Sequence, residues 1–159
     1  MRRLMTCLGA AAVVLAVVAN TGAASGGPRL QGAFKIAATI QGNDFGIRKG
    51  TKTADVYKLT PTCPSGGCAN VKLDRDGGNH AHYKSTLHRV ASGKYKGTEG
   101  PEAYNCPDNS AGSFTADHAI AVTRSENGRA TKFTGSIKIH FKGCTEKYIN
   151  YTIVGTPKN

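Results

Sequence analysis

The stretch that decides the fold is residues 32–41, which read Gly32-Ala33-Phe34-Lys35-Ile36-Ala37-Ala38-Thr39-Ile40-Gln41. Its apolar side chains recur at every second position from Phe34 to Ile40, with Lys35, Thr39 and Gln41 between them. Successive side chains of a strand point to opposite faces, so this period of two places the apolar residues on one face. The segment therefore predicts a β-strand with one buried face.

Similar short segments continue along the chain, separated by clusters of Gly, Asn, Asp or Pro. They cover residues 51–60, 69–73, 81–90, 94–98, 113–123, 133–141 and 147–155, with a looser stretch at 99–112. No helical period interrupts them, so we expect an all-β domain with a single antiparallel meander of about eight strands. A closed barrel is favoured over a two-sheet sandwich, because closure removes exposed sheet edges.

The first residues indicate export. Arg2 and Arg3 precede an apolar run over residues 4–19, and small residues follow at 22–25. This pattern predicts an N-terminal signal helix in a signal peptide of residues 1–24, then a linker at 25–30 and the β domain at 31–159. The run is about 16 residues, shorter than the roughly 20 that a spanning helix needs, so no stable membrane span is expected after cleavage. An uncleaved anchor is the alternative.

Four cysteines remain once Cys7 is removed with the signal peptide. An even number in an exported chain of this size indicates disulfides, and four cysteines allow three pairings. Cys63 and Cys68 flank Pro-Ser-Gly-Gly, a tight-turn sequence that can bring them together. We therefore favour Cys63–Cys68 with Cys106–Cys144, and a metal site is the weaker interpretation of these residues.

Several motifs together carry a resemblance: Gly32-Ala33-Phe34, Leu59-Thr60-Pro61-Thr62-Cys63 with Cys68, Tyr95-Lys96-Gly97, Cys106, Ala130-Thr131-Lys132-Phe133-Thr134-Gly135 and Gly143-Cys144. Over nearly the whole mature chain these residues resemble small exported actinobacterial domains of unassigned function, which occur alone or as extracellular modules behind a membrane anchor. The resemblance implies no catalytic residues. The opening Gly-x-aromatic also resembles lipocalin-like (calycin-like) barrels, where Trp normally stands at the position of Phe34.

Positive charge is the most informative functional feature. The formal net charge is +11, and it is +9 without Arg2 and Arg3. We expect a basic surface formed by Lys35, Lys58, Lys72, Lys84, Lys94, Lys96, Lys138 and Lys142. Outside a cell such a surface suits anionic envelope polymers or a protein partner, and nucleic acid is the lesser option because an exported protein meets little of it. A generally solvated surface is the alternative.

Two other functions are hypotheses. A closed barrel of this size can carry one small apolar ligand, and its cavity would be lined by Phe34, Ile36, Tyr57, Leu59, Phe114, Phe133, Ile137 and Phe141. A small secreted hydrolase such as a ribonuclease would need acid–base residues drawn from Asp117, His118, Arg124, Glu126 and His140. No spacing rule connects those five residues, so we expect a non-catalytic binding module.

Metal binding has only weak candidates. His80 and His82 would share one strand face and could contribute two ligands, but Lys84 lies on the same face and repels a cation. Residues 74–79, Asp-Arg-Asp-Gly-Gly-Asn, lack the later glutamate of a calcium loop and fit a hairpin turn better. We therefore expect no metal and no cofactor.

Overall fold

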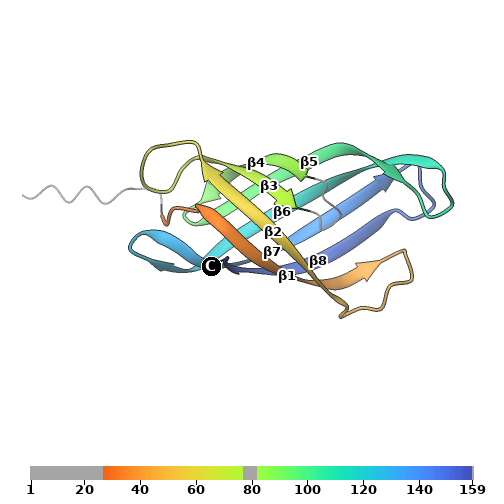
Figure 1. The fold of residues 1–159 in the computed structure, drawn as a ribbon, viewed down its shortest axis with the longest axis horizontal. Coiled ribbons are helices and arrows are strands. Elements are labelled where there is room, and N and C mark those ends of the chain that lie inside the picture. Colours follow the sequence, from red (N-terminus) through yellow and green to blue (C-terminus); the bar gives the residue numbers. More distant parts are fainter. Residues whose placement is uncertain (1–26, 77–81, 159) are drawn as a thin grey trace, which may run out of the picture.

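Eight antiparallel strands follow one another in sequence order (Figure 1). The computed structural model describes residues 27–76 and 82–158, so the expected signal peptide and His80 lie outside the described residues. The strands are β1 (Gly32–Asn43), β2 (Lys52–Pro61), β3 (Asn70–Asp76), β4 (His82–Ala91), β5 (Lys94–Asn105), β6 (Ala111–Glu126), β7 (Arg129–Lys142) and β8 (Tyr148–Pro157). Within these described residues no helix is long and apolar enough to cross a membrane.

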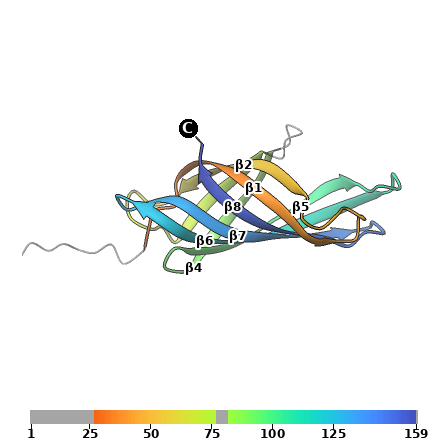
Figure 2. The same ribbon diagram turned by 90° about the horizontal axis from the view of Figure 1, so that it is seen from below.

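The meander closes into a barrel. Each strand pairs with its successor, and β8 returns to β1 with a register that runs from Phe34↔Pro157 to Asn43↔Ile149. The strands wind obliquely around the long axis of the molecule (Figure 2). The expected all-β meander is therefore confirmed, and the closed barrel, rather than the two-sheet sandwich, is the observed architecture.

Connections divide between the two ends of the barrel. We call one end the terminal end, because residues 27–31 and Lys158 lie there together with the 62–69 loop and the β4–β5 and β6–β7 turns (Figure 1). The other end, the distal end, carries the loops at residues 44–51, 106–110 and 143–147. This arrangement follows from an even number of alternating strands, which brings both ends of the domain to the same side.

Aromatic and branched side chains fill the middle of the barrel. Phe34 of β1 and Phe133 of β7 pack with ring centroids 5.1 Å apart, and both are almost fully buried. Gly155 of β8 makes room for the Phe133 ring, because a Cβ at that position would collide with three of the ring carbons. The inward alternation expected from the sequence for residues 32–41 is the one observed, with Phe34, Ile36, Ala38 and Ile40 buried.

The terminal end is closed by a segment that the sequence assigns to the linker. Leu30 is fully buried in the core, and Arg29 forms backbone hydrogen bonds with Gly128 (2.7 Å) and Ala130 (2.9 Å). Arg29 and Leu30 therefore pack with the barrel, ahead of its first strand. The physical reason is that an open barrel end exposes apolar core, which Leu30 covers.

Strand β5 is longer than the sequence predicts. We expected a strand at 94–98 and an irregular stretch to 112, yet β5 runs from Lys94 to Asn105. Its pairing with β6 breaks between Glu99 and Glu102 and then resumes to Asn105↔Ala111. Gly100 and Pro101 lie inside this irregularity, where a residue without a backbone N–H is tolerated. The two residues that signal a loop therefore mark a bulge within one strand.

Two disulfides hold opposite ends of the barrel. Cys63 is bonded to Cys68 at the terminal end, and Cys106 to Cys144 at the distal end. Both match the expected pairing. The Cys106–Cys144 bond connects the β5–β6 loop to the β7–β8 loop across 38 residues of sequence, whereas Cys63–Cys68 spans only 5. Two disulfides are compatible with an extracellular protein.

The two disulfides should stabilise the fold unequally. Replacing Cys106 and Cys144 together by alanine should lower the free energy of unfolding by about 4 kcal/mol, and replacing Cys63 and Cys68 by about 2 kcal/mol, because the longer closed loop removes more entropy from the unfolded chain. Urea unfolding of the two double variants measures this. A larger loss for the Cys63/Cys68 variant would contradict the argument.

Candidate functional site

An ion-pair network lies inside the barrel near its distal half. Arg75 of β3 donates two hydrogen bonds to Glu99 of β5, from Nε to Oε2 (3.1 Å) and from Nη2 to Oε1 (2.6 Å). Its Nη1 donates a third to Asp55 Oδ2 of β2 at 3.3 Å. The Tyr83 ring of β4 lies over the guanidinium, 4.5 Å from its carbon to the ring centroid. One arginine thus connects four strands through side chains alone.

His118 of β6 extends the network toward the opposite wall. Its Nε2 lies 3.3 Å from Glu99 Oε2, and its Nδ1 lies 3.3 Å from the Tyr57 hydroxyl of β2. An ionised carboxylate only accepts hydrogen bonds, so His118 Nε2 donates to Glu99. The side chains of His118 and Glu99 are both 0 % exposed.

Burial and charge act in opposite directions on the two carboxyls. For Glu99, burial alone would raise the pKa, but the hydrogen bonds and charges of His118 and Arg75 outweigh it and lower the pKa below its ordinary value. For Asp55, burial dominates and raises the pKa, despite a hydrogen bond from the Val56 N–H and the charge of Arg75. Glu99 therefore holds its charge more firmly than Asp55 does.

The network is placed where the barrel wall has its shortest ladder. Strands β4 and β5 pair only at His88↔Lys96, Arg89↔Tyr95 and Ala91↔Lys94, near the terminal end. Beyond the distal end of this ladder, the bidentate Arg75–Glu99 pair connects β3 to β5 through the barrel interior. The two strands on either side of β4 are thus joined by side chains in this part of the barrel.

The structure does not bring together the five residues proposed for hydrolysis. The side chain of His118 is buried beside Glu99, and both side chains are 0 % exposed. His140 and Asp117 are half exposed on the outer surface with Nε2 and Oδ2 3.7 Å apart, while Arg124 and Glu126 are exposed close to the β6–β7 turn. The structure therefore separates the five residues into three places.

A cavity of about 230 Å³ opens above the network at the distal mouth of the barrel. Its polar lining comes from Thr53, Asp55, Arg75 and Tyr151, and its apolar lining from Ile36, Ala38, Ala54, Ile137 and Ile139. Of the eight side chains expected around a ligand cavity, only Ile36 and Ile137 line it. Phe34, Tyr57, Leu59, Phe114 and Phe133 are packed in the core, and Phe141 packs against it.

The outer surface carries a second candidate site, which we call the lysine face. It consists of Lys58, Lys72, Lys84, Lys96 and Lys138, on strands β2 to β5 and β7. These five side chains line two adjoining grooves, of about 460 Å³ across β2–β4 and about 900 Å³ across β4–β7, with Thr86 on the border of both. Lys94 lines a shallower depression beside Lys96, and Lys35 and Lys142 are exposed elsewhere.

The lysine face has free cations. Among residues 27–76 and 82–158, none of its five lysines forms an ion pair. Asp74 lies between Lys58 and Lys84 in the register but is hydrogen-bonded to His82 at 3.0 Å, and Asp117 accepts a 2.7 Å hydrogen bond from Thr98. The two acids of the grooves are thus engaged by other partners.

The metal hypothesis gains no support from the part of the chain that the structure describes. His82 is exposed and hydrogen-bonded to Asp74, while His88, on the same strand, is bonded to Asn70 at 2.8 Å. No group of three or more His, Cys, Asp or Glu side chains within the described ranges could hold an ion.

Sequence reasoning missed the interior charges. Arg75 shares the inward phase of Val71 and Leu73, and Glu99 shares that of Tyr95. A charged residue in phase with buried apolar neighbours is the signal that could have found them.

Comparison of the chain with protein-family models, with curated proteins and with solved structures found no match.

Glu99→Gln should lower the free energy of unfolding by about 3 kcal/mol at pH 7, because it leaves Arg75 in the interior without its main counter-charge. The exposed Glu126→Gln is the matched control and should change little. Since the folded pKa of Glu99 is depressed, its contribution is fully present above its ordinary value of 4.5 and is lost as the pH falls through the folded pKa. Urea unfolding of both variants between pH 3 and pH 7 measures the difference from wild type. A difference for Glu99→Gln that is small, or that does not shrink in acid, would contradict the network.

Proposed function

We propose that the protein is an exported, non-catalytic binding module whose lysine face holds an anionic polymer of the cell envelope. The observation that carries this proposal is the pair of adjoining grooves lined by five lysines without ion-pair partners among the described residues. Free ammonium groups on neighbouring strands present repeated positive charge to an extended chain. Threonine and serine hydroxyls between them, at Thr60, Thr86 and Ser136, add hydrogen-bond donors.

Rigidity supports the same proposal. The lysines project from paired strands, with Lys72 opposite Thr60 on one side and Thr86 on the other. A site on strands loses less conformational entropy on binding than one on loops. The two disulfides are compatible with an extracellular protein, which would place this face among polymers bearing phosphate or carboxylate groups.

Neutralising three lysines of one groove should weaken polymer binding. Lys58→Gln, Lys72→Gln and Lys84→Gln together should reduce affinity for poly(glycerol phosphate) at least tenfold. The slope of log K against log salt should also become less steep by about 2 to 3, because binding of the polymer then releases fewer of its counterions. Fluorescence anisotropy with labelled polymer over a salt series measures both quantities.

A charge-matched triple variant provides the control. Lys35→Gln, Lys142→Gln and Lys158→Gln remove the same charge from exposed positions outside both grooves and should leave most of the affinity intact. Equal losses in the two triple variants would mean that net charge, rather than the lysine face, governs binding. Wild-type protein that does not bind the polymer at low salt would overturn the proposal.

A second candidate function rests on the cavity at the distal mouth. Its apolar walls with Asp55, Arg75 and Tyr151 on one side suit a small molecule that has an apolar body and one polar group. Ile137→Trp should fill this cavity and abolish the binding of indole, used as a probe, while Val154→Trp on the outer surface should not. Isothermal titration calorimetry checks the prediction, and thermal unfolding checks that both variants are folded. Indole that binds the filled variant as well as the wild type would exclude this site.

A further inference from the structure

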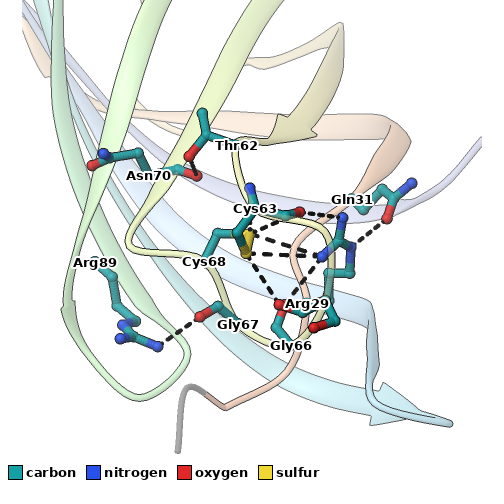
Figure 3. Close-up of a disulfide and its surroundings, with 10 residues drawn as sticks. Arg29, Gln31, Thr62, Cys63, Gly66, Gly67, Cys68, Asn70 and Arg89 are labelled. Carbon is teal, nitrogen blue, oxygen red and sulfur yellow. Dashed lines mark hydrogen bonds between the residues drawn. A yellow bond between two sulfur atoms is a disulfide. The ribbon is translucent and has the colours of Figure 1, made fainter. Parts of the chain in front are cut away.

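The Cys63–Cys68 disulfide lies beneath a guanidinium group (Figure 3). Arg29 Nη1 is 3.9 Å from Cys63 Sγ and 3.8 Å from Cys68 Sγ. The arginine is held in place by hydrogen bonds from Nη2 to the Cys63 carbonyl oxygen (2.8 Å) and from Nε to Gln31 Oε1 (2.6 Å). A fixed cation therefore faces both sulfur atoms of this bond.

The two sulfurs differ in surroundings. Cys68 is 2 % exposed, and its Sγ accepts a hydrogen bond from the Cys63 backbone N–H at 3.3 Å, whereas Cys63 is half-buried. A cation and an N–H donor interact weakly with a neutral disulfide sulfur and strongly with a thiolate. Their differential effect stabilises the reduced form, with Cys68 as the sulfur best prepared to carry negative charge.

The surrounding loop does not depend on the disulfide. Thr62 bonds to the Asn70 carbonyl through both its backbone N–H (3.1 Å) and its hydroxyl (3.0 Å), which closes the loop at its base. Arg89 of β4 donates to the Gly67 carbonyl oxygen at 2.7 Å and brings a second positive charge to the loop. These bonds keep residues 62–70 in place when the disulfide opens.

The Cys106–Cys144 bond has the opposite character. Both of its cysteines are buried, and its sulfurs are pressed against Gly112, where an added Cβ would come within 2.8 Å of each. Lys147 Nζ donates to the Cys144 carbonyl oxygen at 2.5 Å, but within the described residues no arginine or lysine side chain is hydrogen-bonded to either sulfur of this disulfide. The same protein thus contains one enclosed disulfide and one that is partly exposed beneath a cation.

We propose that Cys63–Cys68 is a redox-active disulfide that exchanges with thiols. The thiolate of an external thiol attacks the more accessible Cys63 Sγ, the Cys63–Cys68 bond breaks, and its electron pair leaves on Cys68 Sγ beside Arg29 and the Cys63 N–H. A second external thiolate then attacks the external sulfur of the mixed disulfide, which releases Cys63 as a thiolate and yields the oxidised external disulfide. Two electrons pass from the external thiols to the protein, so a dithiol substrate is oxidised in this direction, and the reverse sequence reduces an external disulfide and restores the Cys63–Cys68 bond.

The test is redox titration of the full chain in glutathione buffers, with the free thiols alkylated and mapped by mass spectrometry. Cys63 and Cys68 should become reduced while Cys106 and Cys144 remain bonded. Arg29→Gln should lower the equilibrium constant for reduction of Cys63–Cys68 about tenfold, equivalent to about 30 mV. The control Arg48→Gln, in the distal 44–51 loop, should leave the constant unchanged.

A second measurement avoids any structural effect of losing Arg29. In wild-type protein reduced at Cys63–Cys68, the rate of alkylation by iodoacetamide should reach half its plateau clearly below pH 8.5, about the pKa of an ordinary cysteine thiol. A midpoint at or above that pH would overturn the proposal. So would simultaneous reduction of both disulfides, or an Arg29→Gln protein that is reduced as readily as the wild type.

Discussion

The bidentate ion pair between Arg75 and Glu99 lies beside the seam where the closed barrel has its shortest backbone ladder. Seven of the eight seams between strands have long backbone ladders, but β4 and β5 pair at only three positions. Across the remainder of that seam, two charged side chains span the interior from β3 to β5. A buried pair gains little net stability because both ions lose their hydration. Its directional bonds nevertheless specify which strands face each other, and removing one partner leaves a buried charge.

The Arg75–Glu99 pair and its partners also occupy part of the barrel interior. Asp55, His118 and Tyr57 are part of the network, and Phe34 and Phe133 pack against each other in the core. In the described part of the chain, the protein's own side chains thus fill much of the interior, and a small cavity lies at the distal mouth. The polymer of the proposed function would be met on the outer surface, where the lysine face lies.

Much of the fold could be predicted from the sequence, because the alternation of apolar and polar residues shows which face of a strand is buried. Phe34 to Ile40 and the phase of Val71 and Leu73 predict the inward side, and sequential turns predict a meander. The interior network did not follow, because its central pair joins strands that are not neighbours, Arg75 on β3 and Glu99 on β5. The burial of Glu99 was also hard to predict because Gly100 and Pro101 follow it. These two residues are typical of a loop, although here they lie in a bulge within β5. The lysines were predictable as exposed residues, but their grouping into two grooves depends on register, which composition does not contain.

The least predictable part is the segment before the first strand, and it shows why burial matters more than sequence position. Leu30 covers the terminal end of the core, and this fixes Arg29 against the β6–β7 turn through backbone bonds. The fixed backbone then directs the Arg29 guanidinium onto the Cys63–Cys68 loop. Hydrophobic closure of the barrel end therefore also creates the electropositive surroundings of one disulfide. The other disulfide is pressed against Gly112 at the distal end and closes the longer loop. Its role is to stabilise the fold by restricting the unfolded chain.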